Sequence, residues 1–174
     1  MHVFCVDDDD FHRGKIQEVV SQSCELKGIS DCTIIGCCDG DDFLKKVDGI
    51  TPKFITLDIN MPNKDGLSTL VRYKKLNPSV PIYMASSENE SVVKRLHTKK
   101  RDDIDPAKKE QLLSKVVDRV KNGVHEPDKL NSVLEAVANL GMDPIAVAKS
   151  YGANGFIIKP FDRDQTAEIL ARLL

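Results

Sequence analysis

HVFCVDDDD, residues 2–10, sets a short run of β-branched and aromatic residues directly before four aspartates. The arrangement recurs in FITLD (residues 54–58), where an apolar run ends on Asp58. Short apolar runs that stop at turn-forming residues are typical of buried strands. In open α/β sheets the ligand lies beyond the carboxyl ends of the strands. The aspartates are therefore predicted to face a ligand site.

Two later apolar runs end on other polar groups. PIYMA (residues 81–85) stops at Ser86, and GFII (residues 155–158) stops at Lys159. If both runs are strands of the same sheet, a hydroxyl and an ammonium join the carboxylates at one edge. Carboxylates combined with such groups indicate a site for magnesium and a phosphoryl group.

Strand and helix patterns alternate along the first half of the chain. CTIIG (residues 32–36) reads as a further strand, and apolar residues recur at helical spacing between the strands. This alternation favours a parallel sheet with right-handed crossovers. The residues that mark the helices are Ile16, Val19, Val20 and Leu26; Phe43, Leu44 and Val47; Leu67, Leu70, Val71 and Leu76; and Ala167, Ile169, Leu170, Leu173 and Leu174.

The alternation breaks between the fourth and fifth strands. Acidic residues stand before the prolines at 106, 127 and 144, an arrangement that suits helix starts. We predict helices over residues 89–101, 106–122, 127–140 and 144–151. The middle two carry apolar stripes and are expected to form a helical hairpin, so residues 89–143 are predicted to be a helical insertion within one domain spanning 1–174.

Composition narrows the function classes. The 174 residues carry a net charge of −2 and 41% hydrophobic residues, which is ordinary for a globular protein. No apolar stretch approaches the roughly 20 residues that span a bilayer, so a membrane partner is not expected. Residues 94–101 are basic, but acidic residues follow at once without aromatics. A solvated helix face is favoured there over a nucleic-acid contact.

The five cysteines, an odd number, all lie within the first 38 residues. Their spacing contains no CxxC motif and no metal-ligand pattern with histidine. Unpaired thiols in a reducing compartment are the favoured interpretation, and cytoplasm is the expected location. A redox or metal role is the alternative.

Four motifs together resemble the receiver domain of two-component response regulators. They are VDDDDFHR (6–13), LDINMPNKDGL (57–67), MASSE (84–88) and GANGFIIKPF (152–161). Each is weak alone, but all four occur in order at predicted strand ends. The resemblance implies a doubly wound sheet of five parallel strands in the flavodoxin-like order 2-1-3-4-5. Among receivers, the chain resembles the stand-alone, chemotaxis-type regulators in particular.

The resemblance assigns roles to residues at the four strand ends. Asp58 matches the phosphoacceptor, and Asp7 and Asp8 match the acid pair that holds Mg²⁺. Ser86 matches the switch hydroxyl and Lys159 the conserved ammonium of the family.

Further roles follow from the same resemblance. Phe156 matches the aromatic switch position, and Asn60 and Glu88 match positions that tune the lifetime of the phosphoryl group. The backbone carbonyl of Asn60 is an implied magnesium ligand. The peptide bond before Pro160 is implied to be cis.

The favoured hypothesis is a receiver that takes a phosphoryl group from a sensor histidine kinase or a histidine phosphotransfer protein. It would act through protein contacts, without a substrate of its own and without a separate output domain. An unknown downstream protein would meet residues 89–143. One alternative is a scaffold with vestigial phosphorylation. Another is a magnesium-dependent phosphohydrolase with Asp58 as nucleophile, which is disfavoured because Asn60 cannot protonate a leaving group.

Overall fold

The computed structural model of the protein describes residues 1–87, 148 and 151–174, and only the backbone of Ser86 and Ser87. Within these residues, five strands form one parallel sheet in the order β2-β1-β3-β4-β5. The strands are β1 (His2–Val6), β2 (Thr33–Cys37), β3 (Phe54–Asp58), β4 (Ile82–Ser87) and β5 (Gly155–Lys159). The predicted fold class is confirmed.

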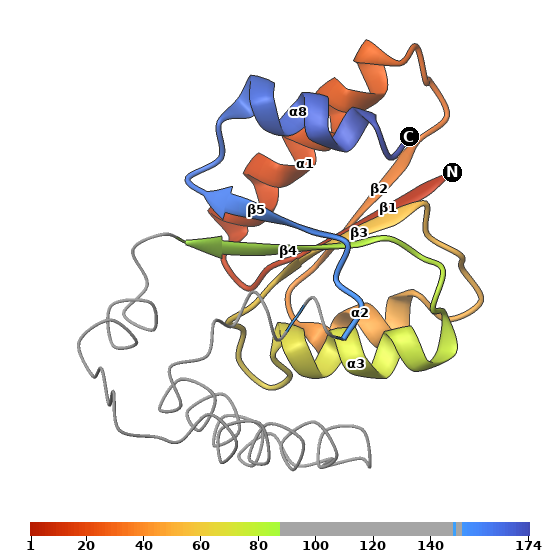
Figure 1. The fold of residues 1–174 in the computed structure, drawn as a ribbon, viewed down its shortest axis with the longest axis vertical. Coiled ribbons are helices and arrows are strands. Elements are labelled where there is room, and N and C mark those ends of the chain that lie inside the picture. The colour runs from red at the N-terminus through yellow and green to blue at the C-terminus, as the bar shows by residue number, and fades with distance from the viewer. Residues whose placement is uncertain (88–147, 149–150) are drawn as a thin grey trace, which may run out of the picture.

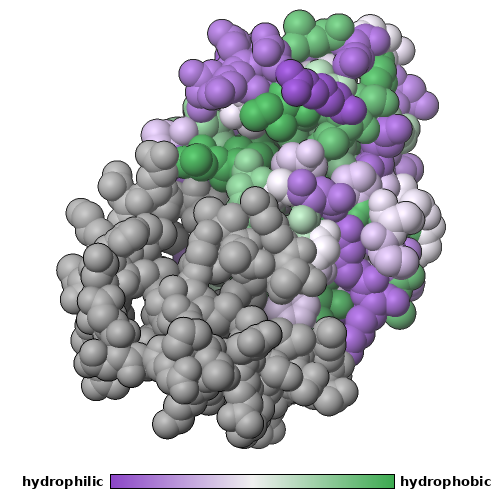
Figure 2. Space-filling view, in the orientation of Figure 1, coloured by the Kyte–Doolittle hydropathy of each residue, from purple (hydrophilic) through white to green (hydrophobic). Residues whose placement is uncertain are grey.

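Helices cover both faces of the sheet (Figure 1). On one face lie α1 (Asp10–Leu26) and α8 (Arg163–Ala171), and on the other lie α2 (Gly40–Lys46) and α3 (Gly66–Leu76). The carboxyl ends of β4 and β5 point the same way, as parallel pairing requires. Hydrophilic side chains cover much of the outer surface over α1 and α8, and apolar side chains gather beside β5 (Figure 2).

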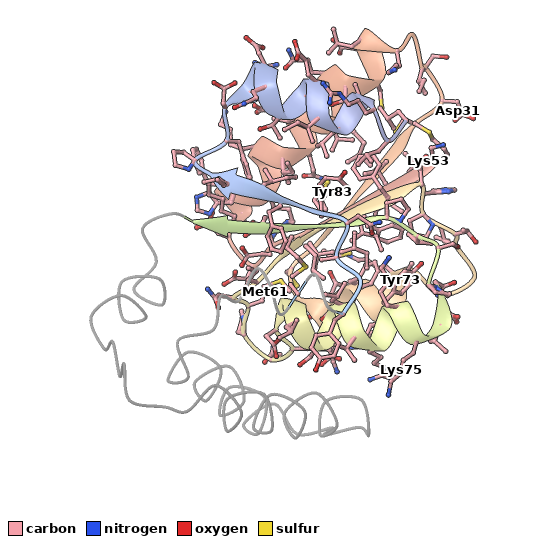
Figure 3. The ribbon with its side chains drawn as sticks, viewed as in Figure 1. Asp31, Lys53, Met61, Tyr73, Lys75 and Tyr83 are labelled. Carbon is pink, nitrogen blue, oxygen red and sulfur yellow. The ribbon has the colours of Figure 1, made fainter. Side chains whose placement is uncertain are left out.

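Two hydrophobic clusters, one on each face, hold these layers together. Along β1, Phe4 and Val6 belong to the cluster under α2 and α3, whereas Val3 and Cys5 belong to the cluster under α1 and α8. The split follows from the strand period, because successive side chains point to opposite faces. In the first cluster Tyr73 of α3 points toward the sheet (Figure 3).

Each of the four described helices begins at an aspartate whose carboxylate accepts a backbone N–H three residues further on. This N-cap satisfies one of the unpaired donors of the first turn. The pairs are Asp9 with His12 (3.0 Å), Asp39 with Asp42 (2.7 Å), Asp65 with Ser68 (2.9 Å) and Asp162 with Gln165 (2.9 Å). Much of the acidic character near the strand ends is therefore structural.

Some details depart from the periodicity. Leu26 and Leu76 are the last residues of α1 and α3 and are 60% and 73% exposed, so they lie outside the core although their spacing matches that of buried residues. Helix α8 ends at Ala171, so Leu173 and Leu174 lie beyond the helix to which their spacing assigned them. The predicted helical hairpin and the insertion 89–143 lie outside the described residues.

Candidate functional site

Two buried carboxylates mark the carboxyl edge of the sheet. Asp58 is the last residue of β3, and Asp7 follows β1 directly; they are 5% and 2% exposed. The backbone N–H of Asp7 bonds the carbonyl of Cys37 on β2 at 3.0 Å, so the strand pairing positions it. Asp58 lies opposite Ala85 of β4. Sheet registration therefore brings together groups that are far apart in the sequence.

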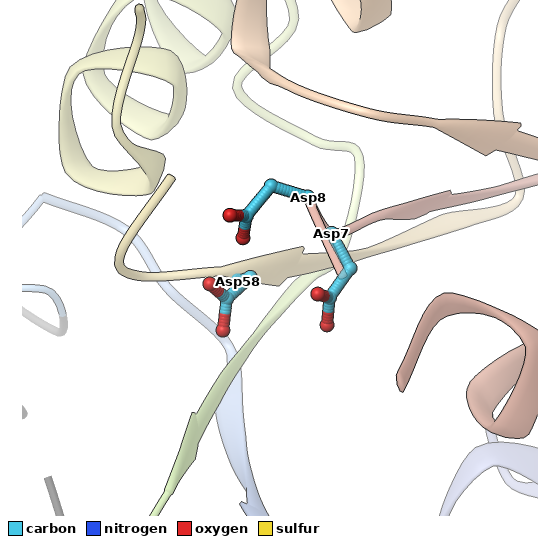
Figure 4. Close-up of side chains that lie close together, drawn as sticks. All are labelled: Asp7, Asp8 and Asp58. Carbon is cyan, nitrogen blue, oxygen red and sulfur yellow. The ribbon is translucent and has the colours of Figure 1, made fainter. Parts of the chain in front are cut away.

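Asp8 completes a cluster of three carboxylates (Figure 4). One oxygen from each of Asp7, Asp8 and Asp58 lies within 4.8 Å of the others. Asp8 is exposed, unlike its two neighbours. The cluster thus has a buried base and one side open to water.

Lys159 bridges the two buried carboxylates. Its ammonium lies 2.6 Å from Oδ1 of Asp58 and 2.8 Å from Oδ2 of Asp7, and its side chain is 7% exposed. Burial by itself lowers the pKa of this ammonium, but the hydrogen bonds to Asp58 and Asp7 and their charges outweigh burial and raise the pKa above its ordinary value. Lys159 is therefore a cation at neutral pH.

Backbone and side-chain donors hold the remaining oxygens. The N–H of Asp9 donates to Oδ1 of Asp7 at 3.0 Å, and the N–H of Asn60 donates to Oδ2 of Asp58 at 3.2 Å. The guanidinium of Arg13 donates to the carbonyl of Asp7 at 2.7 Å and also bonds the carboxylate of Asp10. The first turn of α1 and the end of β3 thus orient both carboxylates.

The first residue of α3 leaves no room for a side chain. The N–H of Gly66 bonds the carbonyl of Ile59 at 3.0 Å, and a Cβ on Gly66 would lie 1.9 Å from the carbonyl oxygen of Asp58. Asn63 has a positive φ of 60° and donates from its side chain to Asp39 at 2.9 Å. The start of α3 is therefore packed directly against the backbone of Asp58.

The structure describes some of the other predicted site residues in full and others only in part or not at all. The backbone of Ser86 lies beside Ile158 of β5, one position beyond the partner of Asp58, while its side chain and Glu88 lie outside the described parts. Phe156 pairs with Met84 and packs, half-buried, against the cluster under α2 and α3. Asn60 is exposed, and the Lys159–Pro160 peptide bond is cis.

Sequence reasoning missed three contributors to the site. Arg13 lies in a quoted motif, and its place one turn after the α1 N-cap could have signalled that it reaches back to Asp7. Gly66 carries the weaker signal of a glycine in a loop before a helix. The Asn63–Asp39 contact joins segments that no sequence pattern connects.

The donor set fits a magnesium ion. Mg²⁺ prefers hard oxygen ligands and keeps several of its waters, and the cluster offers three carboxylates with an exposed side at Asp8. Two acids and the ammonium of Lys159 balance to one negative charge, and Asp8 adds a second. This net negative charge favours the binding of a divalent cation at this edge of the sheet.

The sequence model described as the response regulator receiver domain matches residues 3–121. The chain belongs to the response regulator receiver domain family. Receivers are components of two-component signalling, they bind Mg²⁺ at an acidic pocket, and they imply a phosphodonor and a downstream partner. The resemblance to receiver domains that the four motifs indicated is confirmed.

Curated relatives match about half of the chain. A protein-glutamate methylesterase/protein-glutamine glutaminase 1 of Shewanella denitrificans is 38% identical over 88 residues, covering 50% of this chain and 21% of that protein. A protein-glutamate methylesterase/protein-glutamine glutaminase of Lawsonia intracellularis is 36% identical over 86 residues, covering 49% and 22%. The chain spans about a fifth of the length of these relatives.

Solved receivers share the fold. The receiver domain of NtrX from Brucella abortus superposes with a TM-score of 0.56 at 20% identity, covering 99% of this chain and 97% of that one. Chemotaxis protein CheY4 of Vibrio cholerae gives a TM-score of 0.53 at 19% identity, covering 99% of this chain and 98% of that one.

Among the described helices, none combines the length and apolar character that crossing a membrane requires.

Proposed function

We propose that Asp58 is the phosphoacceptor of this receiver, with Asp7 and Asp8 holding Mg²⁺ beside it. The observation that carries the proposal is the bridge from Lys159, at the end of β5, to Asp58 at the end of β3 and Asp7 directly after β1. A lysine on a solvated loop would not be buried between two carboxylates.

The chain's own groups account for the transfer step. An oxygen of Asp58 forms a bond to phosphorus while the bond from phosphorus to the imidazole nitrogen of the donor breaks. The ammonium of Lys159 already lies against Asp58, so a small movement brings it to a phosphoryl oxygen. The N–H of Asn60 steadies the second oxygen of the acceptor. Magnesium bound at the cluster would offset the negative charge of the incoming group.

The donor in this proposal is a sensor histidine kinase or a histidine phosphotransfer protein in the cytoplasm. The protein has no substrate of its own beyond its phosphorylation and dephosphorylation. A downstream protein is proposed to read the phosphorylated state through residues 89–143, an insertion within a single receiver domain spanning 1–174. Five cysteines without disulfides suit a reducing compartment.

The switch is proposed to run from Ser86 to Phe156. The Ser86 hydroxyl would donate to a phosphoryl oxygen, and the space it leaves would be taken by the Phe156 ring. Phe156 is half-buried beside the core, so an inward turn of the ring would bury more apolar surface. Asn60 and Glu88 would make the phosphoryl group short-lived, and a lifetime of hours would contradict that part.

Labelling with acetyl phosphate and Mg²⁺ tests the acceptor. We expect intact-protein mass spectrometry to show one added phosphoryl group, which is absent in Asp58→Asn and in the presence of a chelator. Asp48→Asn, which removes an exposed carboxylate elsewhere, is the matched control and should label normally. Undiminished labelling of Asp58→Asn would place the acceptor at another residue and refute the proposal.

Amide hydrogen exchange with magnesium and beryllofluoride, which mimics the acyl phosphate, tests the output. We expect protection to change near residues 7–10 and 58–66 and to extend into 89–143. Changes confined to the strand ends and to residues 152–161 would refute the output role of the insertion while leaving the acceptor intact. A phosphohydrolase would hydrolyse a generic aryl phosphate with multiple turnovers. We expect this protein to show no such turnover.

A further inference from the structure

The loop between β3 and α3, residues 59–65, is fastened at Asn63 to the start of α2. The side-chain amide of Asn63 donates to Oδ2 of Asp39 at 2.9 Å. The other carboxylate oxygen of Asp39 caps α2 and accepts the backbone N–H of Asp42 at 2.7 Å. Helices α2 and α3 lie on the same face of the sheet (Figure 1). One carboxylate therefore both begins α2 and holds the loop that follows Asp58.

The contact between Asn63 and Asp39 is sheltered from water. Asp39 is 9% exposed. Burial raises the pKa of Asp39, but the hydrogen bonds from the N–H of Asp42 and the amide of Asn63 outweigh burial and hold the pKa below its ordinary value. Asp39 is therefore an anion at neutral pH. Hydrogen bonds to a charged acceptor are stronger than those between neutral groups.

The backbone at Asn63 does not itself require the amide. Its φ of 60° lies in the left-handed region, which glycine adopts without steric cost and asparagine tolerates. A glycine at this position would therefore keep the turn and lose only the side-chain link to Asp39. The amide thus has a role that can be separated from the shape of the backbone.

Further contacts join the loop to α2. The backbone N–H of Gly40 donates to the carbonyl of Lys64 at 3.2 Å, and the ammonium of Lys64 lies 2.6 Å from the carboxylate of Asp41. A Cβ on Gly40 would overlap the hydroxyl of Thr69 on α3, so the two helices approach closely here. These contacts do not involve the side chain of Asn63. We therefore expect the protein to stay folded when that side chain is removed.

The same loop begins at the phosphoryl site. The backbone N–H of Asn60 donates to Oδ2 of Asp58 at 3.2 Å. One residue further on, the buried side chain of Met61 packs into the cluster under α2 and α3. The backbone of Asn60 therefore lies between a bond to Asp58, a core contact at Met61 and the link to α2 at Asn63.

We propose that Asn63 is a positioning residue for the magnesium site and for phosphorylation of Asp58. Its amide, anchored to Asp39, restrains the loop that carries the backbone carbonyl of Asn60. The inference rests on the proposed function, in which that carbonyl and the carboxylates hold Mg²⁺. Groups that orient metal ligands strengthen metal binding although they do not touch the metal. Loss of the amide frees the loop and weakens binding without removing a ligand.

Calorimetric titration of the full-length protein with Mg²⁺ tests this role, at a temperature where circular dichroism shows every variant folded. Asn63→Gly keeps the backbone conformation and the net charge and removes the amide. We expect its dissociation constant for Mg²⁺ to rise about tenfold, the lower end of the range for partners that orient metal ligands. The Mg²⁺ concentration that gives half the maximal rate of acetyl phosphate labelling should rise by the same factor.

The matched control is Ser68→Ala. This neutral change removes a 2.7 Å hydrogen bond from the Ser68 hydroxyl to Asp65, at the junction of the loop with α3. The backbone N–H of Ser68 still donates to Asp65, so the cap of α3 is kept. We expect the control to bind Mg²⁺ as the wild type does. A loss in Ser68→Ala equal to that in Asn63→Gly would overturn the assignment to Asn63.

A double-mutant cycle isolates the contact with Asp39. Serine is a preferred N-cap, so Asp39→Ser keeps the start of α2, but its single oxygen serves the cap and the amide of Asn63 loses its acceptor. Asn63→Gly should therefore weaken Mg²⁺ binding about tenfold in the wild type and little in the Asp39→Ser background. The charge change at residue 39 is common to both members of the second comparison and cancels.

The outcomes separate this inference from the proposed function. If Asn63→Gly melts at a lower temperature but binds Mg²⁺ as tightly as the wild type, the amide is purely structural and the inference is overturned, while Asp58 stands as the acceptor. Equal weakening in both backgrounds also overturns it, because the contact with Asp39 is then not the cause. A wild-type protein that neither binds Mg²⁺ nor labels would overturn the proposed function and this inference together.

Discussion

Replacing Lys159 by methionine tests the charge balance of the site most directly. The substitution keeps an unbranched side chain of similar length and removes the ammonium that lies 2.6 Å from Asp58 and 2.8 Å from Asp7. Both carboxylates are almost fully buried, so water cannot take over the lost charge. The variant therefore holds two acids close together without the cation that bridges them.

The cost can be worked from burial. Removing one partner of a buried ion pair destabilises a protein by about 3–5 kcal/mol, because the remaining charge is left uncompensated. For a domain of this size that loss corresponds to a fall in Tm of roughly 6–20 °C. The matched control is Lys15→Met, which breaks an exposed pair with Glu18 at 3.0 Å. Exposed pairs contribute less than about 1 kcal/mol.

Thermal unfolding followed by circular dichroism, with chelator and then with magnesium, measures both effects. In chelator we expect Lys159→Met to melt well below the wild type and below Lys15→Met. Magnesium should raise the Tm of Lys159→Met more than that of the wild type, since a cation among the carboxylates restores the missing positive charge and ligand binding stabilises the folded state. The reasoning is refuted if Lys159→Met and Lys15→Met melt together in chelator.

Two further predictions concern packing at the site and the dependence of stability on pH. Gly66→Ala should abolish or strongly reduce acetyl phosphate labelling and cost about 1–3 kcal/mol or more in urea unfolding, because its Cβ would overlap the carbonyl oxygen of Asp58 at 1.9 Å. Gly14→Ala, with nothing within 4 Å in mid-helix, should label normally and gain about 0.5–1 kcal/mol; equal losses in both variants would contradict the packing argument. Burial raises the pKa of Cys5 from 9.0 to about 12, so the unfolded thiol ionises first and stability falls as pH rises through this window. The free energy of unfolding in urea, measured over this pH window, should therefore fall less steeply with pH for Cys5→Ala than for the wild type, by about 1.4 kcal/mol per pH unit. Equal slopes for the two proteins would count against burial of Cys5 as the cause.

The main features of the site followed from strand ends. Asp7, Asp58 and Lys159 each follow or end an apolar run, and parallel strands bring their carboxyl ends to one edge. Residue type and chain order were enough for that prediction. The bridge itself was not predictable, because the two ammonium–carboxylate contacts depend on how β5 is placed beside β4.

Helix ends and turns were less accessible. Apolar spacing placed Leu26 and Leu76 on the same stripes as buried residues, yet both are exposed at the last position of their helices. The spacing repeats every turn and carries no information about where a neighbouring element stops.

Three properties could be predicted from the amino-acid sequence: which residues form strands, which acidic residues follow those strands, and that the strands form a parallel sheet. These properties are local, because hydrophobic period and turn residues act over a few positions. Three contacts became visible only in the folded structure. Lys159 bonds both Asp7 and Asp58. Arg13 donates to the Asp7 carbonyl, and Gly66 packs against the carbonyl of Asp58. Those contacts arise where separate elements pack at van der Waals distance, and their geometry is set by the whole layered core.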